Sequence, residues 1–514
     1  MSKTIIIIGA GLAGLSAALQ AAENGCNVKL VSSLPSERAQ SVMAEGGINA
    51  ALNTKDENDS PEEHFTDTIK AACGLADPNA VWGMTQAAPE LVHWLLKLGV
   101  KFNMSGYDDV DLRNFGGQKK KRTAFAQSDT GKQIMTAMID AVRRKEASGM
   151  VERFSHHSFL TLRLCGNICC GCVIRDEYSQ ETVELPGDAV IVATGGMHGL
   201  FGNTTGSLSN TGEVTAELFR LGVPLANGEM IQYHPTTVKC GGKRMLISEA
   251  ARGEGGRLFA LRNNQPWYFM EEKYPELGNL MPRDITAREI WKVSHESEVF
   301  LDMTEISKEV ISNKLSGLAD DCMTYLHKDI RKEPVPVLPG IHYFMGGILV
   351  DEQHRTSIQN LYAAGECCAQ YHGANRLGGN SLLGALYGGR VAAKSACEQA
   401  DGVVLSCATQ IDIPPASQIS EIKQLNKVMQ ETMGVVRNEN TLLNGIQTVQ
   451  ALTGNLPLLG MAVLKSALAR KESRGAHWRE DYPKSNDDDY LKTTVARFDG
   501  KQIQISFVPV PERR

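Results

Sequence analysis

The sequence has no long unbroken apolar run and no excess of positive charge. In its 514 residues the most apolar stretch, Thr4 to Leu19, is interrupted by glycines at 9, 11 and 14. It therefore predicts a strand, a turn and a helix, and neither an export signal nor a membrane span. Lysine and arginine total 53 against 59 aspartate and glutamate residues, a net charge of -6. This balance disfavours nucleic acid or an anionic membrane as the main partner.

The cysteines include no Cys-x-x-Cys-His sequence of the kind that attaches haem. All twelve are expected to be reduced thiols, because the chain is long and shows no export signal. Four lie close together, at 165, 169, 170 and 172, but Gly166-Asn167 predicts a tight turn between two short strands. Side chains alternate along a strand, so these thiols would point to both faces of a sheet. No metal or iron–sulfur site is predicted.

The first thirty residues have the pattern of a βαβ unit. A buried parallel strand is expected at Thr4 to Ile8, then the glycine loop Gly9 to Gly14, an alanine-rich helix to about Glu23, and a second strand at Val28 to Val31. Glycines 9, 11 and 14 allow a tight turn, close approach of a pyrophosphate and tight helix packing. The unit predicts a dinucleotide site.

The acidic residue that an NAD site favours is missing at the end of the second strand. Ser32 and Ser33 stand in that place. FAD remains open if a second glycine-rich region reaches the flavin, and Ser41 to Asn49 is such a region. An ordinary surface loop is the alternative for that segment. The sequence favours FAD over NAD.

A glycine-rich turn with one arginine, Arg376, precedes a small-residue helix within Tyr371 to Arg390. Asn380 and Ser381 are placed to cap that helix. A helix N-terminus and a guanidinium both favour a carboxylate or a phosphate. The alternative is a glycine-rich connection with a structural arginine.

Two segments typical of nucleotide-binding domains flank a region with a different pattern of predicted helices and strands. One apolar strand, Asp188 to Ala193, runs into Thr194-Gly195-Gly196, and another, Asn360 to Ala364, runs into Gly365-Glu366. Between them, from about 234 to 339, amphipathic helices mix with short strands. This order predicts a nucleotide domain interrupted by an inserted domain, with a helical segment after Pro414-Pro415.

Ordered motifs along almost the whole chain resemble those of the flavoprotein subunits of fumarate reductase and succinate dehydrogenase, and more loosely L-aspartate oxidase. The motifs are Gly9 to Gly14, Ala44 to Ala50, Gln232 to Thr236, Ser248 to Gly256, Pro282 to Asp284, His342 to Gly347, His372 to Leu383 and Glu472 to His477.

The resemblance implies an α/β protein with a Rossmann-like FAD-binding domain, residues 1–233 plus 341–413. It implies an inserted α+β capping domain at 234–340, a helical domain at 414–480 and a C-terminal extension at 481–514. The active site would lie between flavin and cap. There a hydride passes between flavin N5 and a carbon of a dicarboxylate C=C bond, and a proton reaches the neighbouring carbon.

The resemblance also implies how a substrate is held. Arg376 and His342 would hold one carboxylate. His234 and Ser248 would hold the other, with Ser248 standing where the family often has threonine. Taken alone, a histidine is more often a structural residue with satisfied hydrogen bonds, but the four residues in their motifs favour the binding role.

Arg283 would be the proton donor, as its motif implies. Glu249 and Arg252, three apart on a predicted helix, would return protons to it. The alternative for that pair is an ion pair on a helix surface.

The expected FAD contacts come from the glycine loops, the strand ends and the helix start, and Glu213 replaces an aspartate common in the family. They are Gly9, Gly11, Leu12, Ala13, Gly14, Ser32, Ser41, Glu45, Gly46, Gly47, Thr194, Gly195, Glu213, Glu366, Asn380, Ser381 and Leu382.

Two departures from the family pattern bear on function. Gln40 stands where membrane-complex members carry the histidine that links FAD covalently, so FAD is expected to bind non-covalently. In the family that link accompanies succinate oxidation, so its absence favours reduction of fumarate. Phe115 stands where L-aspartate oxidase has a glutamate for the substrate amino group, which disfavours aspartate. A reductase of another unsaturated carboxylic acid, or an enzyme similar to L-aspartate oxidase, remains the alternative.

No electron carrier besides FAD can be placed in the chain. An iron–sulfur protein is the expected electron donor, with free reduced flavin, a thiol-dependent partner or an NADH-linked protein as alternatives. The protein is expected in the cytoplasm, without direct membrane insertion. It would be peripheral at the inner face of the membrane where a partner subunit holds it.

Overall fold

The computed structural model describes residues 2–106, 109–399, 411, 413 and 418–514. A parallel sheet of order β20-β10-β1-β2-β6 carries the first glycine loop at its carboxyl edge. Its strands are β1 (Thr4–Ile8), β2 (Asn27–Ser32), β6 (Val151–Ser155), β10 (Ala189–Val192) and β20 (Leu361–Ala363). β1 contains four consecutive buried isoleucines, as expected of a parallel strand covered on both faces.

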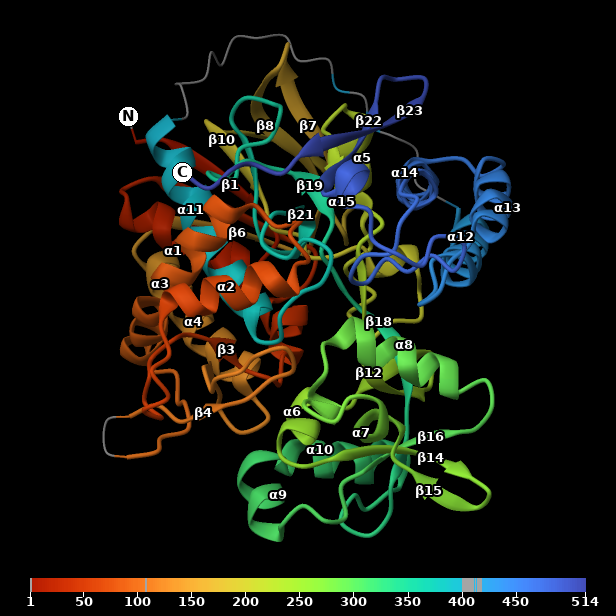
Figure 1. Cartoon of the computed structure of the whole chain (residues 1–514). Coiled ribbons are helices and arrows are strands. Elements are labelled where there is room, and N and C mark those ends of the chain that lie inside the picture. The colour runs from red at the N-terminus through yellow and green to blue at the C-terminus, as the bar shows by residue number, and fades with distance from the viewer. Residues whose placement is uncertain (1, 107–108, 400–410, 412, 414–417) are drawn as a thin grey trace.

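Helices cover one face of this sheet (Figure 1). Ile5 and Ile7 join their core cluster. The helices are α1 (Leu12–Glu23), α3 (Pro78–Leu98), α4 (Thr130–Ala147) and α11 (Asn380–Gln399), and α2 (Pro61–Ala71) packs on α3. α1 and α11 pack closely, because Gly389 leaves no room for a Cβ beside the Ala13 carbonyl and the Ser16 hydroxyl donates to Leu386 O at 2.7 Å. The strand–turn–helix predicted for the first residues is confirmed.

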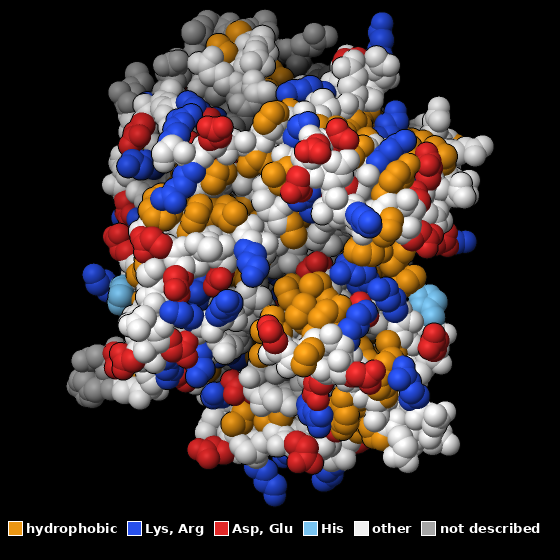
Figure 2. Space-filling model, in the orientation of Figure 1, with side chains coloured by type: hydrophobic (Ala, Val, Ile, Leu, Met, Phe, Trp, Pro, Cys, Tyr) orange, Lys and Arg blue, Asp and Glu red, His pale blue; other side chains and the backbone are white. Residues whose placement is uncertain are grey.

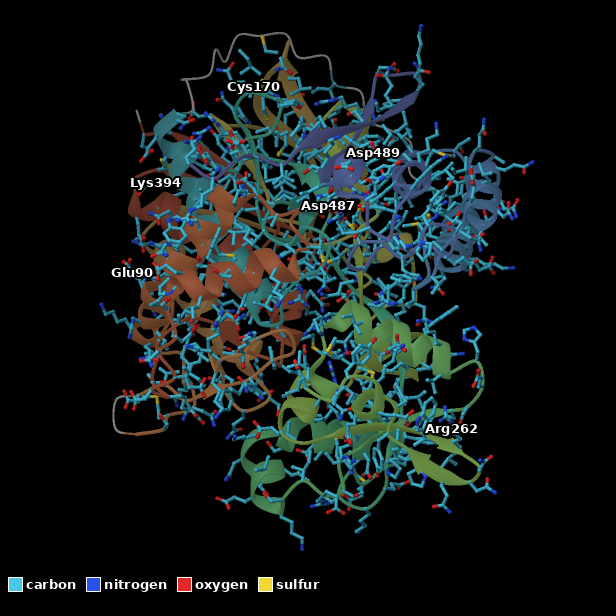
Figure 3. The ribbon with its side chains drawn as sticks, viewed as in Figure 1. Glu90, Cys170, Arg262, Lys394, Asp487 and Asp489 are labelled. Atoms are coloured by element: carbon cyan, nitrogen blue, oxygen red, sulfur yellow. The ribbon has the colours of Figure 1, made fainter. Side chains whose placement is uncertain are left out.

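An antiparallel sheet, β7-β8-β9, covers the other face, where Ile6 and Ile8 lie. Its strands are β7 (His157–Cys165), β8 (Ile168–Asp176) and β9 (Thr182–Pro186), and Figure 3 labels Cys170 on β8. The predicted turn at Gly166-Asn167 is confirmed. The strict alternation of cysteines is wrong, because a register shift near Gly171 places Cys169 and Cys172 in the same core cluster. Within the described residues no group of His, Cys, Asp and Glu is placed to hold a metal.

The region between β12 and β18 forms a separate layer, drawn in green in Figure 1, with its own core. Its sheets are β13-β12-β18 and β15-β14-β16-β17. The strands are β12 (Ile231–Cys240), β13 (Lys243–Leu246), β14 (Arg257–Arg262), β15 (Gln265–Trp267), β16 (Val299–Asp302), β17 (Val335–Pro336) and β18 (Leu338–Phe344). The helices are α6 (Glu249–Gly253), α7 (Phe269–Lys273), α8 (Arg283–Val293), α9 (Lys308–Lys314) and α10 (Ser316–Asp321). This is the segment predicted as the cap.

Helices α12 (Ile419–Thr432), α13 (Glu439–Val449) and α14 (Asn455–Ala469) form the next layer, with α5 (Glu213–Arg220) packed on α14. The predicted boundary at 413/414, with Pro414-Pro415, lies outside the described residues. The last strands, β22 (Lys492–Phe498) and β23 (Ile503–Pro509), complete the sheet β21-β19-β11-β22-β23. Its other strands are β11 (Leu225–Ala226), β19 (Gly347–Leu349) and β21 (Cys368–Ala369).

The described helices include none that is both long enough and apolar enough to cross a bilayer. On the face drawn in Figure 2, lysine and arginine side chains are interspersed with aspartate and glutamate. A mixed surface of this kind agrees with the near balance of charges in the sequence.

Candidate active site

Two irregularities between β12 and β18 carry the two predicted histidines. Gln232 pairs with Tyr343 and Tyr233 with Ile341, so His342 is an extra residue in β18. His234 pairs with Gly340 and Thr237 with Leu338, so β12 has an extra residue between His234 and Thr237. Such bulges bend a strand and turn a side chain away from its regular direction. The two imidazole rings meet edge to face with centroids 5.1 Å apart.

Arg283 is the first residue of α8 and is held by a buried carboxylate. Its Nε donates to Glu249 Oε2 at 2.7 Å. The other carboxylate oxygen accepts the Gly116 N–H at 2.9 Å and lies 3.6 Å from the Arg252 guanidinium. Glu249 and Arg252 are therefore members of one buried chain of charges, and the alternative of a surface ion pair is wrong.

Gln232 joins the two arginines that the sequence assigned to separate tasks. Its Oε1 accepts from Arg283 at 3.1 Å and from Arg376 at 3.0 Å. Its amide nitrogen donates to Asn375 Oδ1 and to the Arg376 carbonyl. The Arg376 guanidinium lies 4.4 Å from the centre of the Tyr343 ring. Sequence reasoning gave Gln232 no role, although it opens the motif that contains His234.

Positive charge in the site exceeds negative charge. Burial, and then the nearby Arg283, lowers the pKa of His234 and of His342 well below the ordinary histidine value, so both rings are neutral at pH 7. Burial tends to raise the pKa of Glu249, but Arg283 and Arg252 outweigh it and hold that pKa below its ordinary value. Two carboxylates, of Glu249 and Glu366, thus act on three guanidinium groups, of Arg252, Arg283 and Arg376.

The imbalance is visible in unused hydrogen-bond donors. Among the described residues, Arg376 Nε and Arg252 Nε are buried without a hydrogen-bond partner, and the Arg252 terminal nitrogen that lies 3.6 Å from Glu249 also lacks one. Burial, followed by repulsion from Arg283, lowers the pKa of Arg376 to about 9. A bound dianion would neutralise the excess and accept the Arg376 donor.

One cavity of about 890 Å³ contains both the cation cluster and the glycine loops. Most of the predicted site residues line it. They include Gly9, Gly11, Ser32, Ser41, Glu45, Phe115, Thr194, Glu213, His234, Ser248, Glu249, Arg283, His342, Glu366, Arg376 and Ser381. Gly14, Arg252 and Asn380 do not line it.

Asn380, predicted as a cofactor contact, does not line the cavity, and its side chain is hydrogen-bonded within the protein. Its amide nitrogen donates to Thr68 and its oxygen accepts from Asn49, with His64 2.9 Å from the same oxygen. The side chain thus fastens the start of α11 to the protein interior. Ser381 and Leu382 are the residues of this turn that reach the cavity.

The first glycine loop fits a dinucleotide. A Cβ on Gly9 would lie 2.3 Å from Ala193 O, and one on Gly14 would lie 1.8 Å from Gly9 O, so both positions require glycine. Gly11 faces open space apart from Ser41 and Ala39, and it caps α1 without a side-chain bond, which leaves backbone N–H groups for a pyrophosphate. The Ser32 hydroxyl is buried without a partner.

Gln40 and Phe115, the two positions at which the sequence departs from the family pattern, both line this cavity. Gln40 Oε1 accepts the Ser207 N–H at 2.6 Å. The Phe115 ring lies so close to Gly46 and Gly378 that a Cβ on either would approach it within 2.7 to 3.0 Å. The wall that Phe115 forms is therefore apolar and rigid.

Glu45 is a buried acid between the glycine loop and the cap. Burial and the nearby Asp321 raise its pKa to about 8, and Arg113 lowers it by less. One of its oxygens is buried without a hydrogen-bond partner. The carboxyl is therefore largely protonated at neutral pH.

Comparison with known proteins gives matches over almost the whole chain. Residues 4–382 match the family model described as an FAD binding domain, and residues 452–513 match the one described as fumarate reductase flavoprotein C-term. The chain is 38% identical to the succinate dehydrogenase flavoprotein subunit of Bacillus subtilis, over 100% of this chain and 98% of that protein. It is 33% identical to the 8-methylmenaquinol:fumarate reductase flavoprotein subunit of Wolinella succinogenes, over 100% of this chain and 92% of that protein.

Among solved structures, a FrdA variant of the E. coli quinol fumarate reductase superposes with a TM-score of 0.89. The two sequences are 27% identical, and the match covers 99% of this chain and 97% of that one.

Proposed function

Because the chain belongs to the family of succinate dehydrogenase and fumarate reductase flavoprotein subunits, we propose that it reduces the C=C bond of fumarate to give succinate. As a family member it is an FAD-dependent oxidoreductase acting on CH–CH groups. The observation that carries the proposal is the pair of buried guanidinium groups at the cavity, Arg283 and Arg376, with the Nε donor of Arg376 left without a hydrogen-bond partner. A small dicarboxylate supplies the missing negative charge.

The substrate is oriented by two sets of donors. Arg376 and His342 hold one carboxylate, and His234 and Ser248 hold the other. The two imidazole rings lie 5.1 Å apart, between centroids, and both line the cavity. Fixing both ends of a four-carbon acid restricts the reacting carbons to one position, which lowers the entropic part of the barrier.

FAD held by residues such as Gly9, Gly11 and Ser381 would supply the hydride for one carbon of the double bond. The cationic cluster stabilises the negative charge that develops on the substrate during that addition. The apolar wall formed by Phe115, 2% exposed, helps to exclude water from the site.

The proton for the neighbouring carbon comes from the Arg283 guanidinium. A guanidinium is a weak acid, so it can serve only if its neutral form is reprotonated at once. Glu249 contacts it at 2.7 Å and can return a proton. Arg252 lies 3.6 Å from the other oxygen of Glu249 and donates to Asn279 O, so it holds that carboxylate from the side opposite Arg283.

Direction is inferred from the residue at position 40. The relatives are named for both directions, so their names do not decide it. Gln40 offers no imidazole for a covalent flavin link, so we propose non-covalent FAD and a bias toward fumarate reduction.

A protein partner is proposed as the source of electrons. The relatives are named as subunits, which supports an electron-transfer partner. We propose an iron–sulfur protein, with the complex in the cytoplasm or held peripherally at the inner face of the membrane through a partner subunit.

The direct test is to mix chemically reduced holoenzyme with fumarate and follow flavin oxidation by stopped-flow absorbance. Rapid oxidation by fumarate, lost by at least about 100-fold in Arg283→Gln, supports the proposal. If fumarate leaves the reduced flavin unchanged while a different unsaturated acid oxidises it, the proposed substrate is wrong.

A further inference from the structure

Two cysteines far apart in sequence bring their sulfur atoms together outside the active site. Cys26 Sγ lies 3.0 Å from Cys397 Sγ, although 371 positions separate the two residues. Both are free thiols. A disulfide bond is about 2.05 Å long, so the two sulfurs need to approach by only about 1 Å to be joined.

Both cysteines are held on firmly placed backbone. Cys26 ends the turn after α1, where its N–H donates to Ala21 O and Gly25 takes the left-handed conformation with φ 77°. Cys397 is in the last turn of α11, one turn after Lys394, which is labelled in Figure 3. The Lys3 ammonium donates to Cys397 O at 2.7 Å and so fastens this helix end. The proximity of the sulfurs follows from the packing of two helices.

The two thiols differ in access. The Cys26 side chain is 5% exposed, whereas Cys397 is partly exposed at the end of its helix. A small oxidant would therefore reach Cys397 first. Cys26 would remain shielded until its neighbour has reacted, which is the arrangement of a reacting and a resolving cysteine.

The helices that carry this pair also form the cofactor cavity at their other ends. α1 begins beside Gly11 and α11 begins beside Ser381, and both of these residues line the cavity. The thiol pair thus lies where the two cofactor-bearing helices finish. A bond there would tie together the far ends of both.

We propose that Cys26 and Cys397 form an intramolecular disulfide when the protein meets a peroxide, and that this bond reversibly fastens α1 to α11. Hydrogen peroxide oxidises the Cys397 thiol to a sulfenic acid and is reduced to water. The Cys26 thiol then attacks that sulfur, the S–S bond forms and a second water leaves. Two electrons pass from the two sulfurs to one peroxide, and a dithiol reductant reverses the change.

The rate of this oxidation depends on pH. Burial, and then the hydrogen bond with Cys26, raises the pKa of Cys397 to about 12. Since the thiolate is the reactive form, cross-linking is slow at pH 7 and quickens about tenfold for each pH unit up to pH 9. The disulfide is therefore expected to form during sustained exposure to peroxide and to form little during a brief exposure.

The experiment treats the holoenzyme with hydrogen peroxide under native conditions, blocks remaining thiols and digests the protein without reduction. The expected product is a peptide pair joined through Cys26 and Cys397, lighter by two hydrogen atoms and separated by dithiothreitol. The oxidised holoenzyme should melt about 3 °C or more higher, because the bond closes a very long loop. Cys26→Ser and Cys397→Ser should each abolish both effects.

A matched control is Cys73→Ser, which removes another partly exposed thiol and should leave the cross-link and the melting shift intact. The proposal is overturned if Cys397 is recovered only as a sulfinic acid or joined to a different cysteine. It is also overturned if the joined peptides appear only after the protein has unfolded. None of these readouts depends on which acid the enzyme reduces.

Discussion

The Arg288 guanidinium lies 4.0 Å from the centre of the Trp478 ring, and this contact joins helix α8 of the cap to the segment that follows α14. The same helix begins with Arg283, the proposed proton donor. The Tyr233 hydroxyl makes a second link, donating to Met433 O at 2.8 Å. The orientation of Arg283 therefore depends on a layer of the protein that does not line the active site.

Replacing Trp478 by leucine should reduce kcat for fumarate by about tenfold and change KM little. The reason is that the α8 helix would lose a cation–π contact, and small displacements of a reacting group cost rate steeply. Steady-state kinetics with an artificial electron donor measure both constants, and Trp478→Phe should restore most of the activity.

The control for this variant is Trp291→Leu, on the same helix. Trp291 meets His295 edge to face, with ring centres 4.3 Å apart. If the two leucine variants lose activity equally, the contact between Arg288 and Trp478 has no special part in placing Arg283.

Replacing Gln232 by leucine should reduce kcat/KM by about 100-fold. Two buried guanidinium groups, of Arg283 and Arg376, would lose their shared acceptor, and a hydrogen bond to a charged group contributes about 1.5–3 kcal/mol. The assay is initial rates over a range of fumarate concentration.

Gln232→Glu distinguishes loss of the acceptor from loss of structure. It retains an oxygen between the arginines but adds negative charge, which repels a dianion. Its KM should rise far more than its kcat falls. Equal kinetic defects in the two variants would contradict a role in holding the arginines.

Glu45 should make the protein less stable as pH rises from about 4.5 to about 8. The pKa of this carboxyl is raised from 4.5 when unfolded to about 8 when folded, so over that range the folded state binds the extra proton and stability is lost with rising pH. The full effect is on the order of 5 kcal/mol, at 1.36 kcal/mol per pH unit. Urea unfolding at pH 5 and pH 8.5 measures it.

Glu45→Gln should flatten this dependence, because glutamine imitates the protonated acid. The variant should match the native protein at pH 5 and exceed it in stability at pH 8.5. Glu37→Gln, at a half-exposed glutamate paired with Arg143, should leave the pH dependence unchanged. Parallel curves for Glu45→Gln and the native protein would refute the assignment.

Acid precipitation of the holoenzyme should leave the yellow flavin in the supernatant. Gln40 cannot form a histidyl link, and its side-chain oxygen is already bonded to the Ser207 N–H. Absorbance of pellet and supernatant after centrifugation decides the matter. Colour retained in the washed pellet would mean that another residue holds the flavin covalently.

Structure could be predicted from the sequence where a short run of residues determines the local backbone conformation. Glycines at 9, 11 and 14 require one particular turn, and the structure has that turn followed by α1. The motifs around Glu249 and Arg283 likewise predicted residues that meet in one cavity. Each of these predictions rested on spacing or on a specific motif.

Prediction failed where a residue's role depends on pairing between distant segments. The function of Gln232 arises from the approach of Arg283 and Arg376, which no local pattern reveals. The common side taken by Cys169 and Cys172 arises from a register shift against β7, and simple alternation cannot predict that. The role of the Asn380 side chain also depends on distant segments, because its amide is hydrogen-bonded to Asn49 and Thr68.

The extra residues in β12 and β18 make chain length itself a functional property of this enzyme. Two deletions would each restore regular pairing: one of the two residues between His234 and Thr237 in β12, or Ile341 in β18. A shift of one residue turns side chains to the opposite face of the sheet, so a histidine would leave the site. Every catalytic residue type would still be present in such a variant. The site would be lost through a change in the number of residues, which a list of the site's side chains would not detect.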